Sequence, residues 1–361
     1  MLRHWLKYVS RHSSYLLTST SIIKSSKICF FFQDIPFRIP LAFMRIYSNN
    51  NKKYEKENVT IINMIKYWHQ IFEKEKIIEP KKSIEHIIAH VLGISRLTDL
   101  SNISTMKLNR EQLQKLEGLC QCRLSRMPVQ YIIGEWDFRH ITLKLEPPIF
   151  IPRPETEIIV DISLKRIVSF KNDKCNILEI GCGSGAICLS LLHSHKNINI
   201  TAIDANSHAC ELTMRNAQDL QLQDRLILFN AILKNDGLIE KKKNFFKDSI
   251  NFYNDKFEII VSNPPYIPTE TVFKLQPEIK LYEDVKALDG GHDGLKLILS
   301  ILKYASEALK IGGFLILEVD FNHPERIEFF IKQNYVNKLK LEYVHKDFAN
   351  KDRFVEILKI G

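Results

Sequence analysis

Apolar and polar residues alternate in blocks along the second half of the chain, from Lys174 onward. Short apolar runs typical of buried strands are separated by segments whose apolar residues recur at helical spacing. The strand candidates are 175–180, 198–204, 225–230, 257–262 and 312–319, and the helix candidates between them are 185–194, 207–219 and 294–310. After another helix near 324–333, residues 339–348 and 353–360 have the pattern of a closing hairpin. This order predicts an α/β fold, with a mostly parallel seven-stranded sheet wound on both faces and ending in an antiparallel hairpin.

The segment from Val59 to about Arg126 has only the helical pattern. Its apolar residues fall on one face of each predicted helix, first at Ile61, Ile62, Ile65 and Trp68, then at Ile84, Ile87, Ile88, Val91 and Leu92. Pro80 separates these two helices, and Asn109 with Gln112 predicts the start of a later one. We therefore expect a small helical bundle ahead of the sheet.

Residues 131–157, YIIGEWDFRHITLKLEPPIFIPRPETE, connect the two patterns. Ile141, Leu143 and Leu145 alternate with polar residues, which indicates a strand, while Gly134 precedes it in a turn and Pro147-Pro148 closes it. This segment is expected to be a hairpin linker between two domains.

The positive charge is concentrated at the start of the chain. The formal net charge is +9, but residues 1–47 contain seven basic residues and one acidic residue, which leaves 44 basic and 41 acidic residues for the rest. The first 47 residues are also rich in Ser and Thr, which together with the basic charge is typical of a mitochondrial transit peptide. In MRIYS, Arg45 lies two residues before Tyr47, as at a matrix-protease cleavage site. A disordered basic tail is the alternative.

Other features of the composition favour a matrix protein. Hydrophobic residues make up 45% of the chain and charged residues 26%, which is ordinary for a globular protein. No apolar run approaches 18 residues, so a membrane-spanning helix is not expected. The seven cysteines include no CxxC pair and no His-spaced partner, and we expect reduced thiols and no metal site.

The segment NILEIGCGSGAICLSLL, residues 176–192, has the pattern of a strand, a glycine-rich turn and a helix. Gly181, Gly183 and Gly185 allow a sharp bend and a ligand close to the backbone, as in a dinucleotide site. Asp204 follows the next strand, where a carboxylate can accept hydrogen bonds from two ribose hydroxyls or, alternatively, cap the next helix. Glu179 before the turn would repel a pyrophosphate and tolerate a cation. The pattern favours S-adenosylmethionine over NAD.

The run FEIIVSNPPYIP, residues 257–268, ends a buried strand on Asn263-Pro264-Pro265-Tyr266. Proline is excluded from the middle of a sheet, so these residues lie at the carboxyl edge of the strand, where α/β sheets bind ligands. The Asn263 side chain and the Pro264 carbonyl can each accept one hydrogen bond from a planar NH₂ group, and Tyr266 can stack on it. A rigid turn without function is the alternative. The sequence favours a clamp for a conjugated amine or amide that accepts a methyl group.

Together with PVQYIIGEWDF (128–138), IFIPRPETE (149–157) and ALDGGHDGL (287–295), these motifs resemble the HemK/PrmC family of protein-(glutamine) methyltransferases, and LEVDFNHPERI (317–327) resembles its mitochondrial branch. The resemblance covers essentially the whole chain after the leader. It implies a transit peptide at 1–47, a helical substrate-recognition domain at 48–127, a hairpin linker at 128–152 and a class I methyltransferase domain at 153–361.

The resemblance also implies an activity and its site. The activity is S-adenosylmethionine-dependent methylation of the glutamine amide in the GGQ motif of a mitochondrial class 1 peptide-chain release factor, which supports translation termination in the matrix. The residues expected to contact the methyl donor are Gly181, Cys182, Gly183, Ser184, Gly185, Asp204 and Asn263. Those expected to hold the glutamine are Asn263, Pro264, Pro265 and Tyr266, with Asn263, Pro264 and Tyr266 as the catalytic group. The protein is expected to be a monomer without direct nucleic-acid or membrane binding.

Two segments depart from the family pattern. Residues 283–288 read EDVKAL where bacterial relatives often have EPxxAL. Ala231 and Ile232 occupy the neighbourhood where many members carry an Asp near the adenine, with Asn230 as a possible substitute. Two other functions remain open: methylation of an amino group on RNA or DNA, which would favour a basic groove, and a non-catalytic interaction factor, which would not need the glycines, Asp204 or NPPY.

Overall fold

The computed structural model describes residues 59–361 except 95–96, 171–173 and 246–249. The predicted transit peptide, its cleavage site and the polar segment that follows lie outside the described residues.

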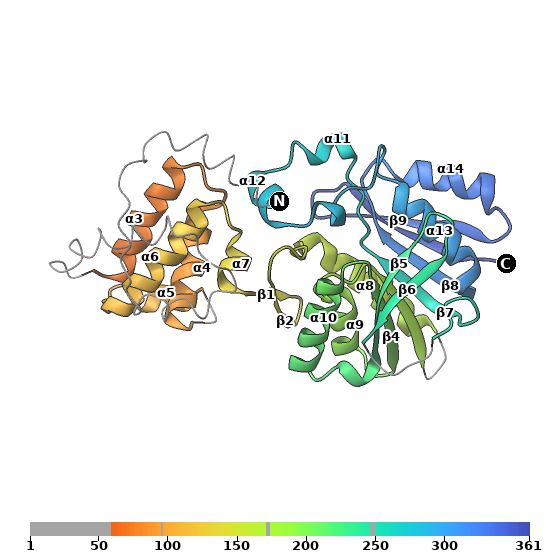
Figure 1. The fold of residues 1–361 in the computed structure, drawn as a ribbon, viewed down its shortest axis with the longest axis horizontal. Coiled ribbons are helices and arrows are strands. Elements are labelled where there is room, and N and C mark those ends of the chain that lie inside the picture. The colour runs from red at the N-terminus through yellow and green to blue at the C-terminus, as the bar shows by residue number, and fades with distance from the viewer. Residues whose placement is uncertain (1–58, 95–96, 171–173, 246–249) are drawn as a thin grey trace, which may run out of the picture. The chain divides into compact units, whose positions relative to one another are not determined.

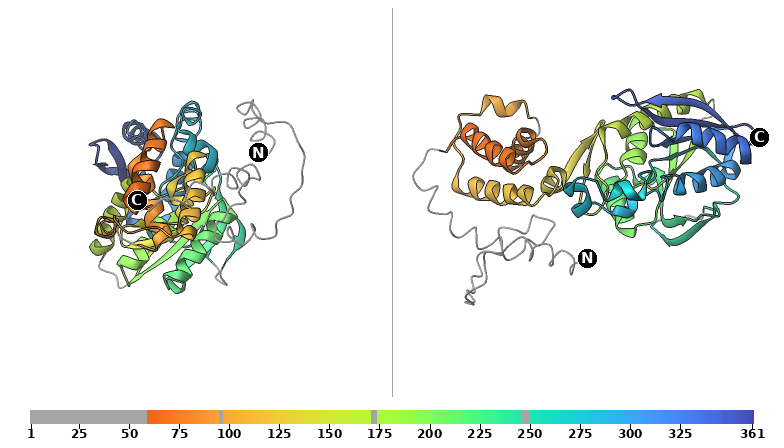
Figure 2. Two further views of the ribbon diagram at one scale, coloured as in Figure 1. Left: turned by 90° about the vertical axis from the view of Figure 1, so that its left-hand side faces the viewer. Right: turned by 90° about the horizontal axis from the view of Figure 1, so that it is seen from above.

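The first part of the described chain is helical. Its elements are α3 (Ile61–Lys74), α4 (Pro80–Leu92), α5 (Asp99–Asn102), α6 (Arg110–Leu124) and α7 (Val129–Ile133). Helices α3 and α6 both pack against α4 (Figure 2). The predicted start of α6 is confirmed: the Asn109 side chain accepts from the Gln112 backbone N–H, and the Gln112 side chain accepts from that of Asn109. Pro80 is the first residue of α4, a position that needs no N–H donor.

A two-stranded antiparallel sheet follows, made of β1 (Glu135–Phe138) and β2 (Ile141–Lys144). The alternating residues Ile141 and Leu143 are buried, while Thr142 and Lys144 are exposed. The chain then continues through a 3₁₀ turn, η2 (Pro154–Thr156), into α8 (Glu157–Ser169).

The rest of the described chain forms an eight-stranded sheet with the order β6-β5-β4-β3-β7-β8-β10-β9 (Figure 1). Strands β5, β4, β3, β7 and β8 are parallel neighbours, and β10 pairs antiparallel with both β8 and β9. The strands are β3 (Cys175–Ile180), β4 (Ile198–Asp204), β5 (Leu226–Leu233), β6 (Ile239–Asn244), β7 (Phe257–Ser262), β8 (Leu309–Glu318), β9 (Leu339–Lys346) and β10 (Asp352–Lys359).

Strand β6 is absent from the sequence-based prediction, which has seven strands. Its sequence, IEKKKN, has three consecutive lysines and no apolar alternation. It is an edge strand, paired antiparallel with β5 alone, and charged lysines are common on edges because they prevent pairing with other chains. Strand β5 is longer than predicted because its last residues, Ala231 to Leu233, pair with β6.

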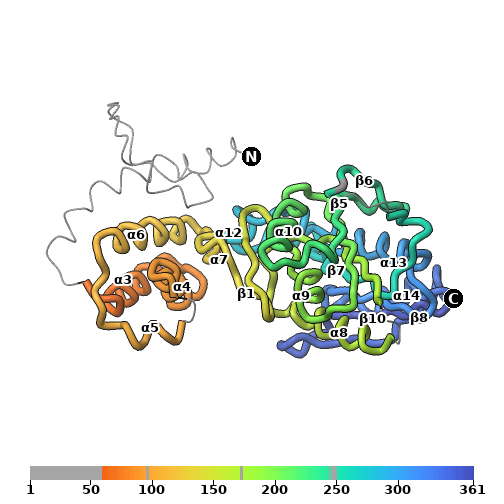
Figure 3. Tube along the Cα trace, turned by 90° about the horizontal axis from the view of Figure 1, so that it is seen from below, coloured from red at the N-terminus to blue at the C-terminus, as the bar shows by residue number. Residues whose placement is uncertain are grey.

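Helices cover both faces of this sheet. Helices α8, α9 (Ala186–Ser194) and α10 (Ser207–Asp219) pack on one face, and α13 (Lys296–Ala308) and α14 (Pro324–Asn334) on the other (Figure 1 and Figure 3). Each face has its own hydrophobic core, because the apolar side chains of a buried parallel strand point alternately to either side. In the described part of the chain, no helix has the length and apolarity needed to cross a membrane.

A long connection between β7 and α13 contains α11 (Thr269–Val272), α12 (Pro277–Tyr282) and η4 (Val285–Ala287). This connection also pairs with the residues that follow β7: the Ile267 N–H donates to the Leu288 carbonyl, and the Ile267 carbonyl accepts from the Gly290 N–H. It also contacts the residues before α8, because Asp284 donates its N–H to the Pro148 carbonyl. This connection therefore lies over the carboxyl ends of the central strands.

Candidate active site

A cavity of about 730 Å³ lies at the carboxyl edge of the central strands. Its volume is within the range of sites for small organic ligands. Among the residues expected from the sequence, those that line it are Gly181, Cys182, Gly183, Ser184, Asp204, Asn263, Pro264, Pro265 and Tyr266. Residues from β3, β4 and β7 meet there because adjacent parallel strands end at the same edge of the sheet.

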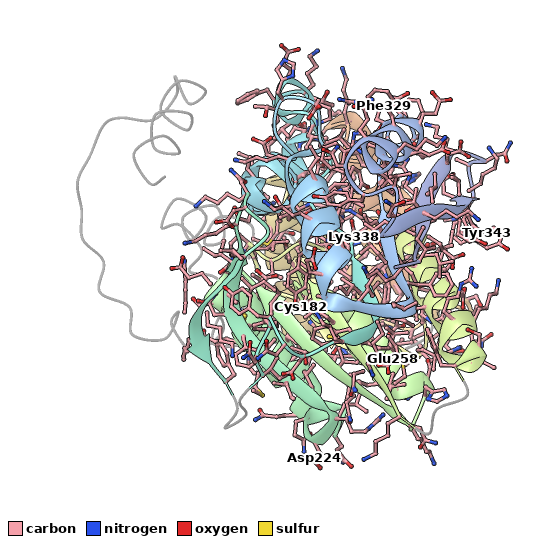
Figure 4. The ribbon with its side chains drawn as sticks, turned by 90° about the vertical axis from the view of Figure 1, so that its right-hand side faces the viewer. Cys182, Asp224, Glu258, Phe329, Lys338 and Tyr343 are labelled. Atoms are coloured by element: carbon pink, nitrogen blue, oxygen red, sulfur yellow. The ribbon has the colours of Figure 1, made fainter. Side chains whose placement is uncertain are left out.

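The turn after β3 leaves its backbone open to the cavity. Gly181 and Gly183 have φ angles of +82° and +58°, and a Cβ placed on either would meet no atom within 4 Å. The space that a side chain would fill is therefore available to a ligand. Cys182 between them lies in the interior of the domain (Figure 4). Gly185 does not line the cavity; it packs against Leu189 and Thr213 at the start of α9.

Asp204, the last residue of β4, lies beside the glycine turn and is held by backbone N–H groups. One carboxylate oxygen accepts the Gly183 N–H at 2.9 Å, and the other accepts the Asn206 N–H at 2.8 Å. Each oxygen keeps a second lone pair, so the carboxylate can still accept from two hydroxyls. The cap of α10 comes from Asn206, whose side chain accepts from the His208 N–H. Asp204 therefore orders the turn and remains available to a ribose, while Asn206 performs the capping.

Glu179 lies beneath the glycine turn and is 1% exposed. It accepts the Cys188 N–H at 3.0 Å, and burial raises its pKa to about 8. Glu179 is among the residues that line the cavity. A cationic ligand would favour the ionised form, in keeping with the charge argument from the sequence.

The wall near the predicted adenine position comes from β5 and β6. Ala231, Ile232 and Leu233 line the cavity together with Lys242. Asn230 is buried and does not line this cavity, and its side-chain NH₂ donates to the Asp204 carbonyl at 2.9 Å. This wall is therefore largely apolar. Its strand β6 could not be predicted from the sequence, because three consecutive lysines do not have the pattern of a buried strand.

The NPPY residues follow β7 directly and have free acceptors. Among the described residues, none donates a hydrogen bond to Asn263 Oδ1 or to the Pro264 carbonyl. Behind them, the DGGHDGL segment packs with almost no space: a Cβ on Gly290 would lie 2.7 Å from the Pro265 carbonyl oxygen, and one on Gly294 only 2.2 Å from that of Tyr266. The glycines of this motif therefore allow the NPPY backbone to pack directly against it.

Thr156 and Glu318 belong to the motifs IPRPETE and LEVD, but neither residue was expected from the sequence to have a function in the site. Thr156 lines the cavity, and its oxygen lies 3.2 Å from Asn263 Nδ2. Glu318, the last residue of β8, accepts from the Thr156 hydroxyl at 2.8 Å and from the Tyr266 hydroxyl at 3.0 Å. Arg353 on β10 places its guanidinium 5.8 Å from the centre of the Tyr266 ring. The acceptor side of the cavity is thus a connected polar network.

The divergent EDVKAL segment takes part in closing the cavity. The Glu283 carboxylate accepts from Arg153 of IPRPETE at 2.6 Å, and Asp284, Lys286, Ala287 and Leu288 line the cavity wall. In the described residues, no cluster of His, Cys, Asp and Glu is arranged to hold a metal ion.

The sheet, the open glycine turn and the carboxylate at the end of β4 define a class I S-adenosylmethionine-dependent methyltransferase, and residues 160–276 match the family model of the methyltransferase small domain. Residues 63–134 match that of the PrmC N-terminal domain. The chain belongs to the release factor glutamine methyltransferase family.

Two curated relatives carry this assignment. The human MTRF1L release factor glutamine methyltransferase is 39% identical over 83% of this chain and 88% of its own length. The release factor glutamine methyltransferase of Fusobacterium nucleatum is 32% identical over 84% of this chain and 79% of its own. A solved methyltransferase from Pyrococcus furiosus is 18% identical, covering 61% of this chain and 88% of that one, with a TM-score of 0.38.

Proposed function

We propose that this enzyme methylates the side-chain amide nitrogen of the glutamine in the GGQ motif of a mitochondrial class 1 release factor. The observation that carries the proposal is the pair of free acceptors, Asn263 Oδ1 and the Pro264 carbonyl, at the cavity wall beside the glycine turn. Two acceptors match the two hydrogens of a primary amide. Relatives named as release factor glutamine methyltransferases support this choice of substrate.

When bound at the turn, S-adenosylmethionine supplies a methyl group on a positively charged sulfur. Gly181, Gly183 and Asp204 are the residues that would hold it. Asn263 and Pro264 bind both amide hydrogens, so that the nitrogen lone pair points toward the methyl carbon. Tyr266 holds the plane of the amide, and this alignment contributes most where the N–C bond forms. One amide proton leaves after the transfer, so no strong base is needed beforehand.

Partner and location are proposed from the charge distribution. Seven basic residues and one acidic residue among the first 47 favour import into the mitochondrial matrix, and cleavage near Tyr47 leaves a nearly balanced chain. A nearly balanced chain favours a protein substrate over a nucleic acid held through its phosphates. The enzyme is proposed to act as a monomer.

The test is incubation of the full chain with a recombinant mitochondrial release factor and labelled methyl donor, followed by peptide mapping. Label is expected on the GGQ glutamine and absent when that glutamine is changed to alanine. Asn263→Ala should lower kcat about 10²–10³-fold, as for the loss of one preorganised contact at a reacting centre. Asn334→Ala, at an exposed position at the end of α14, should leave it unchanged. Label on RNA or DNA instead, or donor binding without any transfer, would refute the proposal.

A further inference from the structure

We propose that Thr156 and Glu318 are positioning residues that fix the orientation of the Asn263 amide, so that its oxygen faces the substrate. This inference rests on the proposed function for the identity of the substrate amide. It assigns a role to two motifs, IPRPETE and LEVD, that the donor and acceptor sites leave without one.

The two hydrogen bonds to the Glu318 carboxylate have a fixed direction. This residue is 2% exposed, and its two carboxylate oxygens face the hydroxyls of Thr156 and Tyr266 at 2.8 and 3.0 Å. A carboxylate can only accept, so both hydroxyls donate their single hydrogen to it. Burial raises the pKa of Glu318, and the two hydroxyl donors and the nearby Arg353 charge offset part of that rise. The geometry has both hydroxyls as the donors to the two carboxylate oxygens.

The hydrogen bond from Thr156 to Glu318 determines which group of Asn263 faces Thr156. Because the Thr156 hydrogen is already used by Glu318, the Thr156 oxygen can only accept from its other neighbour. That neighbour is the Asn263 side chain at 3.2 Å, which must therefore present its NH₂ group to Thr156. The amide oxygen is then on the other side, at the cavity wall.

The opposite orientation of Asn263 would be inactive. An amide rotated by 180° would bring its oxygen to the Thr156 oxygen and its NH₂ group to the substrate NH₂, leaving acceptor against acceptor and donor against donor. An asparagine alone does not distinguish these two orientations. The buried carboxylate of Glu318, acting through one hydroxyl, selects between them.

The first experiment compares Thr156→Val with Thr156→Ser in the full-length enzyme. Valine keeps the shape but removes the hydroxyl, and we expect kcat on the release factor to fall about 10–100-fold. The KM for the methyl donor should change less than about threefold in the valine variant. The serine variant should have a kcat within about threefold of wild type, which is clearly smaller than the loss of about tenfold or more expected for valine. Thr201→Val, an equally buried threonine on β4 outside this network, is the matched control and should keep full activity.

A double-mutant cycle separates positioning from a merely structural role. If Thr156 acts through Asn263, Thr156→Val should have no further effect on kcat in the Asn263→Ala enzyme. If it lowers kcat there by the same factor as in wild type, the two residues act independently and the proposal is wrong.

A second readout does not depend on the substrate. In protein labelled with ¹⁵N-asparagine, the side-chain NH₂ signals of Asn263 are assigned by their loss in Asn263→Ala. We expect Thr156→Val and Glu318→Gln to shift these signals, and Thr156→Ser to leave them near their wild-type positions. Unmoved signals in a folded Thr156→Val protein would overturn the proposal. Shifted signals in an enzyme that does not methylate the release factor would refute the proposed function while leaving the positioning intact.

Discussion

Adding a single methyl group at Gly294 should strongly disturb the acceptor site. A Cβ there would lie 2.2 Å from the Tyr266 carbonyl oxygen, whereas such contacts essentially never fall below 3.0 Å, so the two must separate by about 0.8 Å. His323 Cε1, 2.8 Å away, limits movement in another direction. The hydrogen bonds of Ile267 with Leu288 and Gly290, at 3.0 and 2.9 Å, prevent the two segments from simply separating.

The expected cost of Gly294→Ala has two parts. Its φ of +79° is unfavourable for alanine by about 1–2 kcal/mol, and forcing the overlap adds about 1–3 kcal/mol. A displacement of nearly 1 Å at a reacting centre lowers the rate by about 10². We therefore expect kcat for methyl transfer to fall about 100-fold, with a loss of about 2–5 kcal/mol in the free energy of unfolding.

Gly312→Ala is the matched control. Gly312 has a nearly equal φ of +81°, but a Cβ there would meet no atom within 4 Å. This variant should lose about 1–2 kcal/mol of stability and keep wild-type kcat. Stability is measured by urea unfolding, and kcat at a temperature where both variants are folded. If folded Gly294→Ala has the kcat of the control, the NPPY backbone does not depend on this contact and the reasoning fails.

Three further predictions concern the donor side and the leader. Asp204→Ala should weaken methyl-donor binding about tenfold or more in calorimetry, because hydrogen bonds to a charged acceptor contribute about 1.5–3 kcal/mol; unchanged affinity would exclude the ribose contact. Glu179 has a folded pKa of about 8, above its usual value, so it stabilises the ligand-free fold at low pH and this contribution is lost as pH rises toward 8. Between pH 5.5 and 7.5 the loss should be about 2–3 kcal/mol in urea unfolding and should be absent in Glu179→Gln; parallel curves for the two proteins would contradict this. N-terminal sequencing of protein from mitochondria should start near Ser48, and an intact Met1 would disprove cleavage.

The sequence predicted the elements whose pattern is local. The helix at 207–219 and the strand at 257–262 have the predicted bounds, since apolar spacing and flanking polar residues specify both. Strand β6 was missed because an edge strand needs no apolar face, and its lysines resemble a loop. Helices α11 and α12 were missed because four and six residues are too few to show a helical period.

The candidate site could be predicted only where it follows strand ends. Asp204 is the last residue of β4, and Asn263 directly follows β7, so their place at the sheet edge could be inferred from the sequence. Thr156 is 107 residues from Asn263 and 162 from Glu318. Side-chain contacts over such separations depend on the completed packing of the domain, which no local pattern encodes.

The position of β10 between β8 and β9 has a consequence for synthesis of the chain. Strands β3 and β4, with the donor turn, are complete in the sequence by Asp204. The acceptor side needs Glu318 from β8 and, beside Tyr266, Arg353 from β10. A premature stop codon before Arg353 therefore removes the strand that covers β8 and the cation beside the tyrosine, and yields a chain that retains the donor turn without a complete acceptor site.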